Sequence, residues 1–380
     1  MKDLDSIRTE IDAIDQDLTR LIERRLKLAD EVAAAKCATG KVVSDPARER
    51  AILAQVTNLV GPDFARSVRT VYSTLFGVSK ARQRVRMGRT QPFLAELDKA
   101  ETAAAFPEQA IIACPGSEGA YTQQAASRMF EVPTILYFNG FENVFEAVEK
   151  GVCAYGVLPV ENTSAGSVTA VYDLMQRHRF HIVRGVKLKI EHVLLANPGT
   201  TLEGVREISS HPQALAQCAR FLQAHPEIHT VPLGNTATAA QELAKSGRTD
   251  AAVIASRACA ELYGLEVLSD GIADSTYNYT RFICIARDLE IHSNANKFAL
   301  MMSLPHRPGS LSDTIAKFSA IGVNLTKIES RPVLGSAFEF RFVFEFEAAP
   351  ANPDVRALLA ELSADPEIEH FTFLGAYEER

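Results

Sequence analysis

Three basic residues, Arg8, Arg25 and Lys36, stand within the first 36 residues of the chain. Arg25 and Lys36 are eleven positions apart, so on an ideal α-helix their directions differ by only about 20° and both project from one face. Two cations on one helix face can hold the two ends of a small anion. Arg8 precedes Arg25 by seventeen positions, which places it about 25 Å along the helix and about 100° around it. Arg8 therefore cannot reach the same small molecule within one chain, and can join such a site only on a second subunit.

Five polar residues further along the chain could complete a pocket around that anion. Taken singly, each charged residue is more often part of a solvated helix face than of a site. In combination they complete a pocket that holds cations, hydroxyl acceptors and an amide donor, which favours a site for a small polyanion. They are Asp45, Arg48 and Glu49 on a second predicted helix, and Ser79 and Gln83, one turn apart, on a third.

The elements that must position these residues are three helices predicted in residues 1–90. Residues 2–39 contain neither Gly nor Pro, and apolar residues recur along them at helical spacing, which predicts one helix about 50 Å long. Such a helix exceeds a small domain, so most of its apolar stripe needs a partner outside its own core. A second helix starts near Pro46 and a third covers about residues 63–86. We expect an all-α unit that forms at least a dimer.

This pattern resembles the all-helical class of chorismate mutases. The resemblance rests on the spacing of the three basic residues, followed by D-x2-R-E at 45–49 and S-x3-Q at 79–83. It implies an intertwined dimer, and a unimolecular rearrangement of chorismate to prephenate that needs no nucleophile, metal or proton transfer. The enzyme then holds the dicarboxylate folded and stabilises negative charge on the breaking ether oxygen. The implied roles are carboxylate binding by Arg8, Arg25 and Arg48, contact with the ether oxygen by Lys36 and Gln83, and contact with the ring hydroxyl by Asp45 and Glu49, with Ser79 peripheral.

Beyond a helix-prone segment at 91–107, interpreted as a linker, strands and helices alternate over residues 108–290, which predicts an α/β domain. Five segments rich in small polar residues fall at predicted strand ends, where α/β proteins place their ligand loops. They predict a two-lobed, periplasmic-binding-protein-like cleft, and a solute-binding protein fits it almost as well as an enzyme. The segments are "GSEGAYT" (116–122), "PVENTSAGSV" (159–168), "SHPQALAQC" (210–218), "NTATAA" (235–240) and "NYTRF" (278–282).

Together and in this order, the five segments resemble prephenate dehydratase, and the T-R-F triplet and the S-H-P-Q run are the most specific parts. That reaction expels a ring carboxylate as CO2 and a ring hydroxyl as water. Hydroxide leaves poorly without a proton, so a donor must stand beside that oxygen.

The resemblance assigns the donor role to Thr280 and places Glu161 and Asn162 on the cleft wall opposite it. It places Arg281 nearby to bind substrate charge. The further substrate-binding residues that it implies are Thr163, Ser210, His211, Gln213 and Phe282.

The pattern over residues 296–377 predicts a β-α-β-β-α-β unit, an α+β ferredoxin-like fold. "RPGSLSD" (307–313) and "IESRP" (328–332) in this setting resemble the ACT domain that follows prephenate dehydratases. The implied partner is phenylalanine, acting as an allosteric inhibitor. The residues expected to bind it are Gly309, Ser310, Leu311, Glu329, Ser330, Arg331 and Pro332.

Composition and charge argue against several other classes of protein. The six cysteines stand far apart without a C-x-x-C pair, so we expect no disulfide framework, no metal and no cofactor. The charged N-terminus and the lack of an apolar run of about 18 residues argue against export and membrane insertion and favour the cytoplasm. Residues 1–90 carry 17 Lys+Arg against 12 Asp+Glu. The basic run at 80–89 lacks interleaved aromatic residues, so a small polyanion fits it better than nucleic acid.

In this order the three parts resemble the bifunctional chorismate mutase–prephenate dehydratases over essentially the whole chain. The resemblance implies an isomerase and a lyase of phenylalanine biosynthesis. Two alternatives stay open: a chain in which only the dehydratase is active, and a non-catalytic amino-acid-binding regulator. The regulator is disfavoured because the catalytic residue types of both sites are all present. We also expect a fragment ending near residue 290 to be an active dehydratase that is insensitive to phenylalanine.

Overall fold

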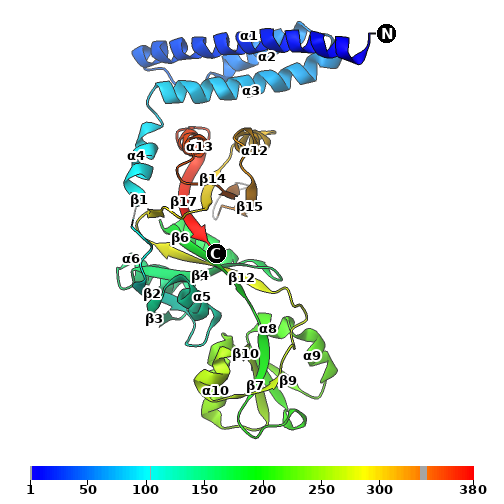
Figure 1. Ribbon diagram of the computed structural model, residues 1–380, viewed down its shortest axis with the longest axis vertical. Helices are drawn as coiled ribbons and strands as arrows, with labels where there is room; N and C mark the ends of the chain where they lie inside the picture. The colour runs from blue at the N-terminus through cyan, green and yellow to red at the C-terminus, as the bar shows by residue number, and fades with distance from the viewer. Residues whose placement is uncertain (1, 103, 334–339) are drawn as a thin grey trace. The chain divides into compact units, whose positions relative to one another are not determined.

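The structure is a computed structural model that describes residues 2–102, 104–333 and 340–380. The chain forms two compact units, and Figure 1 labels their helices and strands. The first contains Met1–Lys99 and Leu300–Thr372, and the second contains Ala100–Ala299 and Phe373–Arg380. The end of the chain thus belongs with its central part, whereas the sequence pattern assigns it to the C-terminal domain.

Four helices form the N-terminal part of the chain. They are α1 (Leu4–Thr39), α2 (Pro46–Asn58), α3 (Pro62–Arg86) and α4 (Gln91–Ala100). The Asp3 side chain caps α1 by accepting a hydrogen bond from the Ser6 backbone N–H over 2.7 Å. Gly40 ends α1 in the left-handed conformation, with φ 66°. The three helices that the sequence predicts are present, and α4 occupies much of the segment interpreted as a linker.

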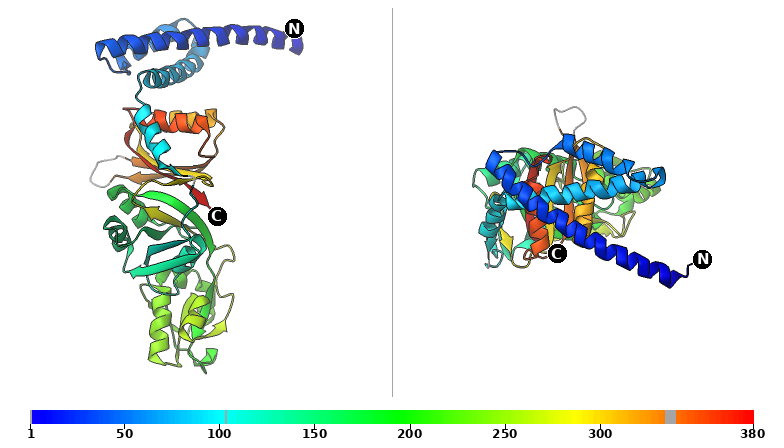
Figure 2. Two further views of the ribbon diagram at one scale, coloured as in Figure 1. Left: turned by 60° about the vertical axis from the view of Figure 1, so that its left-hand side comes forward. Right: turned by 90° about the horizontal axis from the view of Figure 1, so that it is seen from above.

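Most of the apolar stripe of α1 lies outside the core of the first unit. The buried residues of α1 are Ala29 and Ala33. Figure 2 shows that the N-terminal part of α1 extends beyond α2 and α3. The exposed large apolar residues of α1 are Leu4, Ile7, Ile11, Ile14, Leu18, Leu21, Ile22, Leu28 and Val32.

The C-terminal part of the chain has the element order β-α-β-β-α-β, as the sequence predicts. The elements are β14 (Lys297–Ser303), α12 (Ser310–Ala320), β15 (Leu325–Pro332), β16 (Phe340–Glu347), α13 (Pro353–Ser363) and β17 (Glu369–Glu379). The strands lie in the order β15-β16-β14-β17. The buried rings of Phe318 and Phe344 stack with centroids 5.7 Å apart and join α12 to the sheet. β17 begins in the first unit and ends in the second.

The larger sheets of the second unit form two lobes (Figure 1). The first lobe has the strand order β6-β12-β4-β2-β3, and the last residues of β17 pair with β6. Its main elements are β2 (Gln109–Pro115), α5 (Tyr121–Met129), β3 (Val132–Phe138), α6 (Phe141–Glu149), β4 (Tyr155–Asn162), α7 (Thr169–Arg177), β6 (His181–Lys189) and β12 (Tyr279–Ala286). Short strands are β1 (Glu101–Thr102), which pairs with β13 (Ile291–His292), and β5 (Gly166–Ser167), which pairs with β4.

The second lobe has the strand order β11-β7-β10-β8-β9. Its elements are β7 (His192–Ala196), η1 (Leu202–Gly204), β8 (Glu207–Ser210), α8 (Pro212–Ala216), α9 (Ala219–Ala224), β9 (His229–Pro232), α10 (Thr236–Ser246), β10 (Ala251–Ser256), α11 (Ala258–Tyr263) and β11 (Glu266–Ser269). The chain passes between the lobes twice, before β7 and after β11. Two lobes of α/β structure agree with the sequence pattern.

None of the helices in the part of the chain that the structure describes is long and apolar enough to cross a membrane.

Candidate active sites

Arg25 lies at the contact between α1 and α3. Its guanidinium donates a hydrogen bond to the Ser79 hydroxyl over 2.8 Å and lies 5.6 Å from the centroid of the Phe76 ring. The Ser79 hydroxyl donates its own proton to the Leu75 carbonyl, one turn earlier, over 2.7 Å. Because that proton is used within α3, the Ser79 oxygen can accept from Arg25. Ser79 thereby positions the Arg25 cation.

Lys36 lies near the end of α1, where the chain turns into α2. Its ammonium donates a hydrogen bond to the Val43 carbonyl over 2.5 Å. Burial lowers the pKa of Lys36, whereas the charges of Asp45 and Glu49 act to raise it. Asp45 also caps α2 by accepting from the Arg48 backbone N–H over 3.0 Å. One cation and two carboxylates thus share this end of the helical domain.

Gln83 lies one turn beyond Ser79 on α3 and is 7% exposed. Within the described residues its Oε1 has no hydrogen-bond partner, so this buried amide has capacity for a ligand. Arg48 is exposed on α2. Arg8 is exposed near the other end of α1, 3.3 Å from Asp5. One chain therefore carries every residue of the expected mutase site, but α1 separates Arg8 from the others.

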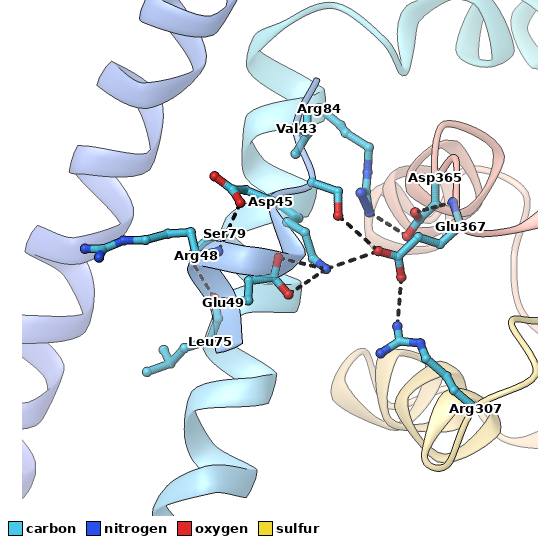
Figure 3. Close-up of polar contacts among 12 residues, drawn as sticks. Val43, Asp45, Arg48, Glu49, Leu75, Ser79, Arg84, Arg307, Asp365 and Glu367 are labelled. Atoms are coloured by element: carbon cyan, nitrogen blue, oxygen red, sulfur yellow. Dashed lines mark hydrogen bonds and ion pairs between the residues drawn. The ribbon is translucent and has the colours of Figure 1, made fainter. Parts of the chain in front are cut away.

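Lys80, which the sequence interpretation did not single out, extends this site toward the C-terminal part of the first unit. Its ammonium lies 3.3 Å from a Glu49 carboxylate oxygen and 3.5 Å from one of Glu367. Glu367 also accepts a hydrogen bond from Arg307 over 2.7 Å, as Figure 3 shows. The sequence signal for Lys80 was only its place in the basic run at 80–89, since its acidic partner Glu367 lies far along the chain.

Asn162 and Thr280 are paired residues on the neighbouring strands β4 and β12. The Asn162 amide has a defined orientation, because its Oδ1 accepts from the backbone N–H groups of Ser164 and Ala165, each over 3.0 Å. Its Nδ2 therefore donates to the Thr280 Oγ1 over 2.9 Å. Since the Thr280 oxygen accepts this bond, the Thr280 proton can be donated to a ligand. The expectation that Asn162 and Glu161 lie across the cleft from Thr280 is wrong, because β4 and β12 pair within one sheet.

Asn278, Gln217 and His192 extend this hydrogen-bond network across both lobes. The Asn278 Oδ1 accepts from the Asn162 Nδ2 over 2.8 Å, and the Asn278 Nδ2 donates to the Gln217 Oε1 over 3.0 Å. The same Gln217 oxygen lies 2.9 Å from the His192 Nε2, and the Gln217 Nε2 donates to the Asn162 Oδ1 over 3.3 Å. Burial lowers the pKa of His192 and outweighs the hydrogen bond to Gln217, which acts to raise it. The ring is therefore neutral near pH 7.

The sequence interpretation did not name these three residues. Gln217 and Asn278 fall within segments that it singled out, whereas His192 had no signal beyond its residue type.

Arg281 and Glu161 form the next pair of residues across β12 and β4. Successive side chains of a strand point to opposite faces of the sheet, so Arg281 points away from the Thr280 side. Arg281 is 7% exposed, its Nη1 lies 3.6 Å from Glu161, and its Nη2 donates to the Tyr377 hydroxyl over 2.8 Å. Its Nε forms a hydrogen-bonded ion pair with Glu379. The geometry therefore corrects the expectation that Arg281 binds substrate charge beside Thr280, because protein carboxylates hold its guanidinium on the other face.

The other expected substrate-binding residues differ in their surroundings. His211 caps α8, its Nδ1 accepting from the Gln213 backbone N–H over 3.2 Å, and burial lowers its pKa. Ser210 is fully buried and donates to a backbone carbonyl of β10. Thr163 is exposed beside the start of β12. Phe282 was expected to bind substrate. This expectation is wrong, because its side chain is buried in the core of the first lobe and does not face a ligand.

The expected effector-binding residues lie at the start of α12 and on β15. Gly309 precedes α12 with φ 91°, a conformation that favours glycine. Ser310 is buried and donates to a backbone carbonyl three residues earlier over 3.1 Å. On β15, Glu329 and Arg331 are half-buried and 3.8 Å apart. The remaining three are Leu311, which is half-buried, and Ser330 and Pro332, which are exposed.

In the described ranges, no group of three or more His, Cys, Asp or Glu side chains is arranged to hold a metal ion. The six cysteines are free thiols, and all but Cys37 are buried.

The chain has one candidate site in its helical domain and a second in its two-lobed α/β domain. This arrangement is typical of a protein with two separate sites for small molecules. Residues 7–84 match the family described as chorismate mutase type II, and residues 112–290 match the prephenate dehydratase family. The bifunctional chorismate mutase/prephenate dehydratase of Enterobacter agglomerans is 32% identical over 363 residues, which cover 94% of this chain and 92% of that protein. The chain belongs to the family of bifunctional chorismate mutase/prephenate dehydratases.

Other relatives share the region that follows the helical domain. Arogenate dehydratase 2 of Petunia hybrida is 38% identical over 285 residues, covering 70% of this chain and 71% of that protein. The structure of prephenate dehydratase from Arthrobacter aurescens, in complex with L-Phe, is 29% identical with a TM-score of 0.63, covering 70% and 89% of the two chains. GqqA, described as a quorum-quenching acylase, is 31% identical with a TM-score of 0.63, covering 71% and 98%.

Proposed function

We propose that this chain catalyses two consecutive reactions at separate sites. The helical domain rearranges chorismate to prephenate, and the two-lobed domain decarboxylates and dehydrates prephenate to phenylpyruvate. The observation that carries this proposal is the oriented Asn162–Thr280 pair, which leaves a hydroxyl proton for a leaving group, in a chain that also carries a complete set of mutase residue types.

The mutase step is a rearrangement within one molecule, so the domain contributes binding geometry and electrostatics. Arg25 and Arg48 bind the carboxylates of the folded substrate. Lys36 and the buried Gln83 amide stabilise negative charge on the breaking ether oxygen. Asp45 and Glu49 bind the ring hydroxyl and also face the Lys36 ammonium.

The dehydratase step breaks two bonds at the ring. The bond to the ring carboxylate breaks to release CO2, its electron pair enters the ring, and the ring hydroxyl leaves as the ring becomes aromatic. Thr280 donates its hydroxyl proton to that leaving oxygen as the carbon–oxygen bond breaks, so the oxygen departs as water, and a proton from solvent restores the Thr280 hydroxyl. A threonine hydroxyl is a weak acid, but the hydrogen bond that it accepts from Asn162 over 2.9 Å polarises its O–H bond.

We further propose that the mutase site is completed by a second copy of the chain. Arg8 and Arg25 are separated by about 25 Å along one helix, so one small substrate cannot contact both within a chain. The exposed apolar stripe of α1 supports a second copy as the partner, because an apolar helix face of this length is normally buried against another protein surface. In that dimer Arg8 of the partner subunit binds a substrate carboxylate.

The C-terminal β-α-β-β-α-β unit is proposed to be an ACT domain that binds phenylalanine and inhibits dehydration. The element order and the placement of Gly309 before α12 support this assignment. The Arthrobacter aurescens relative, which is described in complex with L-Phe, supports the choice of effector. An effector inhibits through unequal affinity for two states of the protein, and typical couplings are about 1–3 kcal/mol.

The proposed setting is the cytoplasm, with neither metal nor cofactor. The free thiols agree with a reducing compartment, and neither reaction requires a metal or redox group.

The test is to incubate the purified protein with chorismate and to follow prephenate and phenylpyruvate over time. Both products should form in succession. If supplied prephenate is converted but chorismate is not, the dehydratase-only alternative holds. If phenylalanine binds but neither substrate reacts, the chain is a regulator and the proposal is wrong.

A further inference from the structure

The last strand of the chain ends in a buried ion cluster on the strand that carries Thr280. We define the C-terminal ion cluster as Arg281, Glu379, Lys297, Lys187 and Tyr377. Arg281, Glu379 and Lys297 are each 7% exposed at their side chains. The Lys297 ammonium lies 2.9 Å and the Lys187 ammonium 3.0 Å from the Glu379 carboxylate. Breaking one partner of such a buried cluster leaves an uncompensated charge in the interior.

Two residues of β17 hold Arg281 from the same side. Tyr377 and Glu379 are two positions apart on a strand, so both side chains point to one face. The Tyr377 hydroxyl accepts from the Arg281 Nη2 over 2.8 Å, and Glu379 pairs with its Nε. Glu378, between them, points to the other face, where it pairs with Arg184 over 2.8 Å.

The end of β17 is built to lie close against the first lobe. A Cβ on Gly375, which has φ 144°, would lie 2.2 Å from the Ile182 carbonyl oxygen, so only glycine allows this approach. A Cβ on Gly185 would lie 3.2 Å from the Tyr377 ring. Two glycines on facing strands therefore give Tyr377 and Glu379 access to Arg281.

The position that they hold is next to an irregularity in the pairing of β12 with β4. The register between β12 and β4 shifts between Arg281 and Phe282. β4 has one extra residue there, Val160, so the ladder of backbone hydrogen bonds on that side of β12 is interrupted, and the side-chain contacts of Arg281 help to hold β12. Thr280 directly precedes Arg281, where the shift begins, and its hydroxyl has to meet the leaving oxygen within hydrogen-bond distance.

We propose that Glu379 and Tyr377 are positioning residues of the dehydratase site, which hold the Arg281 guanidinium and thereby fix β12 so that the Thr280 hydroxyl is correctly placed. The inference rests on the proposed dehydratase activity. β17 begins in the C-terminal domain, and its last residue, Glu379, contacts Arg281, so one strand connects that domain to a contact with the dehydratase strand β12.

The test compares Glu379→Gln with a matched control, Glu378→Gln, in the full chain. Both changes remove one carboxylate from β17, and each carboxylate pairs with a buried arginine, but only Glu379 contacts Arg281. Misplacement of a reacting group by about 1 Å can cost about 100-fold in rate. We expect Glu379→Gln to lower kcat for dehydration of prephenate by about tenfold or more, with KM changed less than about twofold. Glu378→Gln should have near-normal kcat.

Two further variants separate positioning from general loss of stability. Glu379→Asp keeps the charge and should recover part of the lost kcat, and Tyr377→Phe should lower kcat less than Glu379→Gln because it removes one hydrogen bond. Mutase activity of each variant, measured in the same sample, checks that the helical domain is folded, and urea unfolding of each variant checks the dehydratase domain.

The outcomes distinguish this inference from the proposed function. If the unaltered chain does not dehydrate prephenate, the proposed function fails. If the unaltered chain is active and Glu379→Gln matches it, or if Glu378→Gln lowers kcat as much, the positioning role is wrong.

Discussion

The Asn162 amide nitrogen donates a hydrogen bond to the Thr280 hydroxyl oxygen over 2.9 Å. Because the Asn162 oxygen is held by two backbone N–H groups, this amide cannot rotate to accept from Thr280 without losing both bonds. The pair therefore has one polarity, with the threonine proton directed to whatever binds beside it.

Thr280→Val should remove dehydration while prephenate still binds, because it replaces the hydroxyl by a methyl group of similar size. Loss of one donor to developing charge costs about 3–4 kcal/mol, which corresponds to a fall of about 100- to 1000-fold in kcat. Thr280→Ser keeps the hydroxyl and should retain substantial activity. Single-turnover kinetics and equilibrium binding of prephenate would check this, and near-normal turnover by Thr280→Val would refute the assignment of Thr280.

Asn162→Asp tests the polarity of the pair without changing its size. The new carboxylate can only accept hydrogen bonds, so it competes with the substrate for the Thr280 proton. We expect kcat for dehydration to fall by about 100-fold. Because the carboxylate must be ionised to accept that proton, part of the activity should return as the pH is lowered through its pKa. A pH profile of kcat parallel to that of the unaltered chain would contradict this view.

Lys36→Met should abolish mutase activity and leave dehydration of supplied prephenate nearly unchanged. The substitution keeps the apolar stem of the side chain and removes the ammonium, whose loss is expected to cost about 3–4 kcal/mol of transition-state stabilisation. Lys27→Met is a matched control on the same helix, since Lys27 is exposed and pairs with Glu23 over 2.6 Å at the surface. Equal loss of both activities in Lys36→Met would contradict two separate sites.

Mixing an Arg8→Ala chain with an Arg25→Ala chain should restore mutase activity. In the proposed dimer each site takes Arg25 from one chain and Arg8 from the other, so a heterodimer has one intact site and one site without either arginine. A purified heterodimer carrying two different tags should show about half of the unaltered activity, whereas each variant alone is inactive. Absence of activity in a verified heterodimer would exclude a shared site.

The stability of the chain should depend on Glu379 in a pH-dependent way. Burial by itself raises the pKa of this carboxyl, but Arg281 and Lys297 outweigh it and hold the pKa at about 2, against 4.5 for an ordinary glutamate. A carboxyl with a lowered pKa in the folded state stabilises it above the unfolded pKa, and that contribution is lost as the pH falls toward the folded pKa. The contribution is on the order of 3 kcal/mol at neutral pH.

Urea unfolding of the unaltered chain and of Glu379→Gln, at about pH 7 and about pH 3, measures this difference. The unaltered chain should be the more stable at neutral pH, and the gap should narrow in acid. A gap that stays constant between the two pH values would contradict a lowered pKa for Glu379.

The sequence by itself determined the helices and the chemical types of residue at both sites. A long stretch without Gly or Pro and with apolar residues at helical spacing is sufficient for α1, because helix formation depends on neighbours three and four positions away. The D-x2-R-E and T-R-F motifs identified Arg48, Glu49 and Thr280 for the same reason, since each motif is local.

Only the tertiary structure decided which side chains meet. Thr280 was expected to face Asn162 across a cleft, yet the two are paired across β12 and β4. Arg281 was expected to bind substrate, yet it is bound to Glu379, 98 residues later in the chain. The fragment ending near residue 290, which is expected to be active and insensitive to phenylalanine if it folds, would lack the strand end that pairs with β6 and holds Arg281. Strand register and buried ion pairs join residues that are distant in sequence. The energies of these contacts depend on burial and on the neighbouring strands, and no local sequence pattern encodes either.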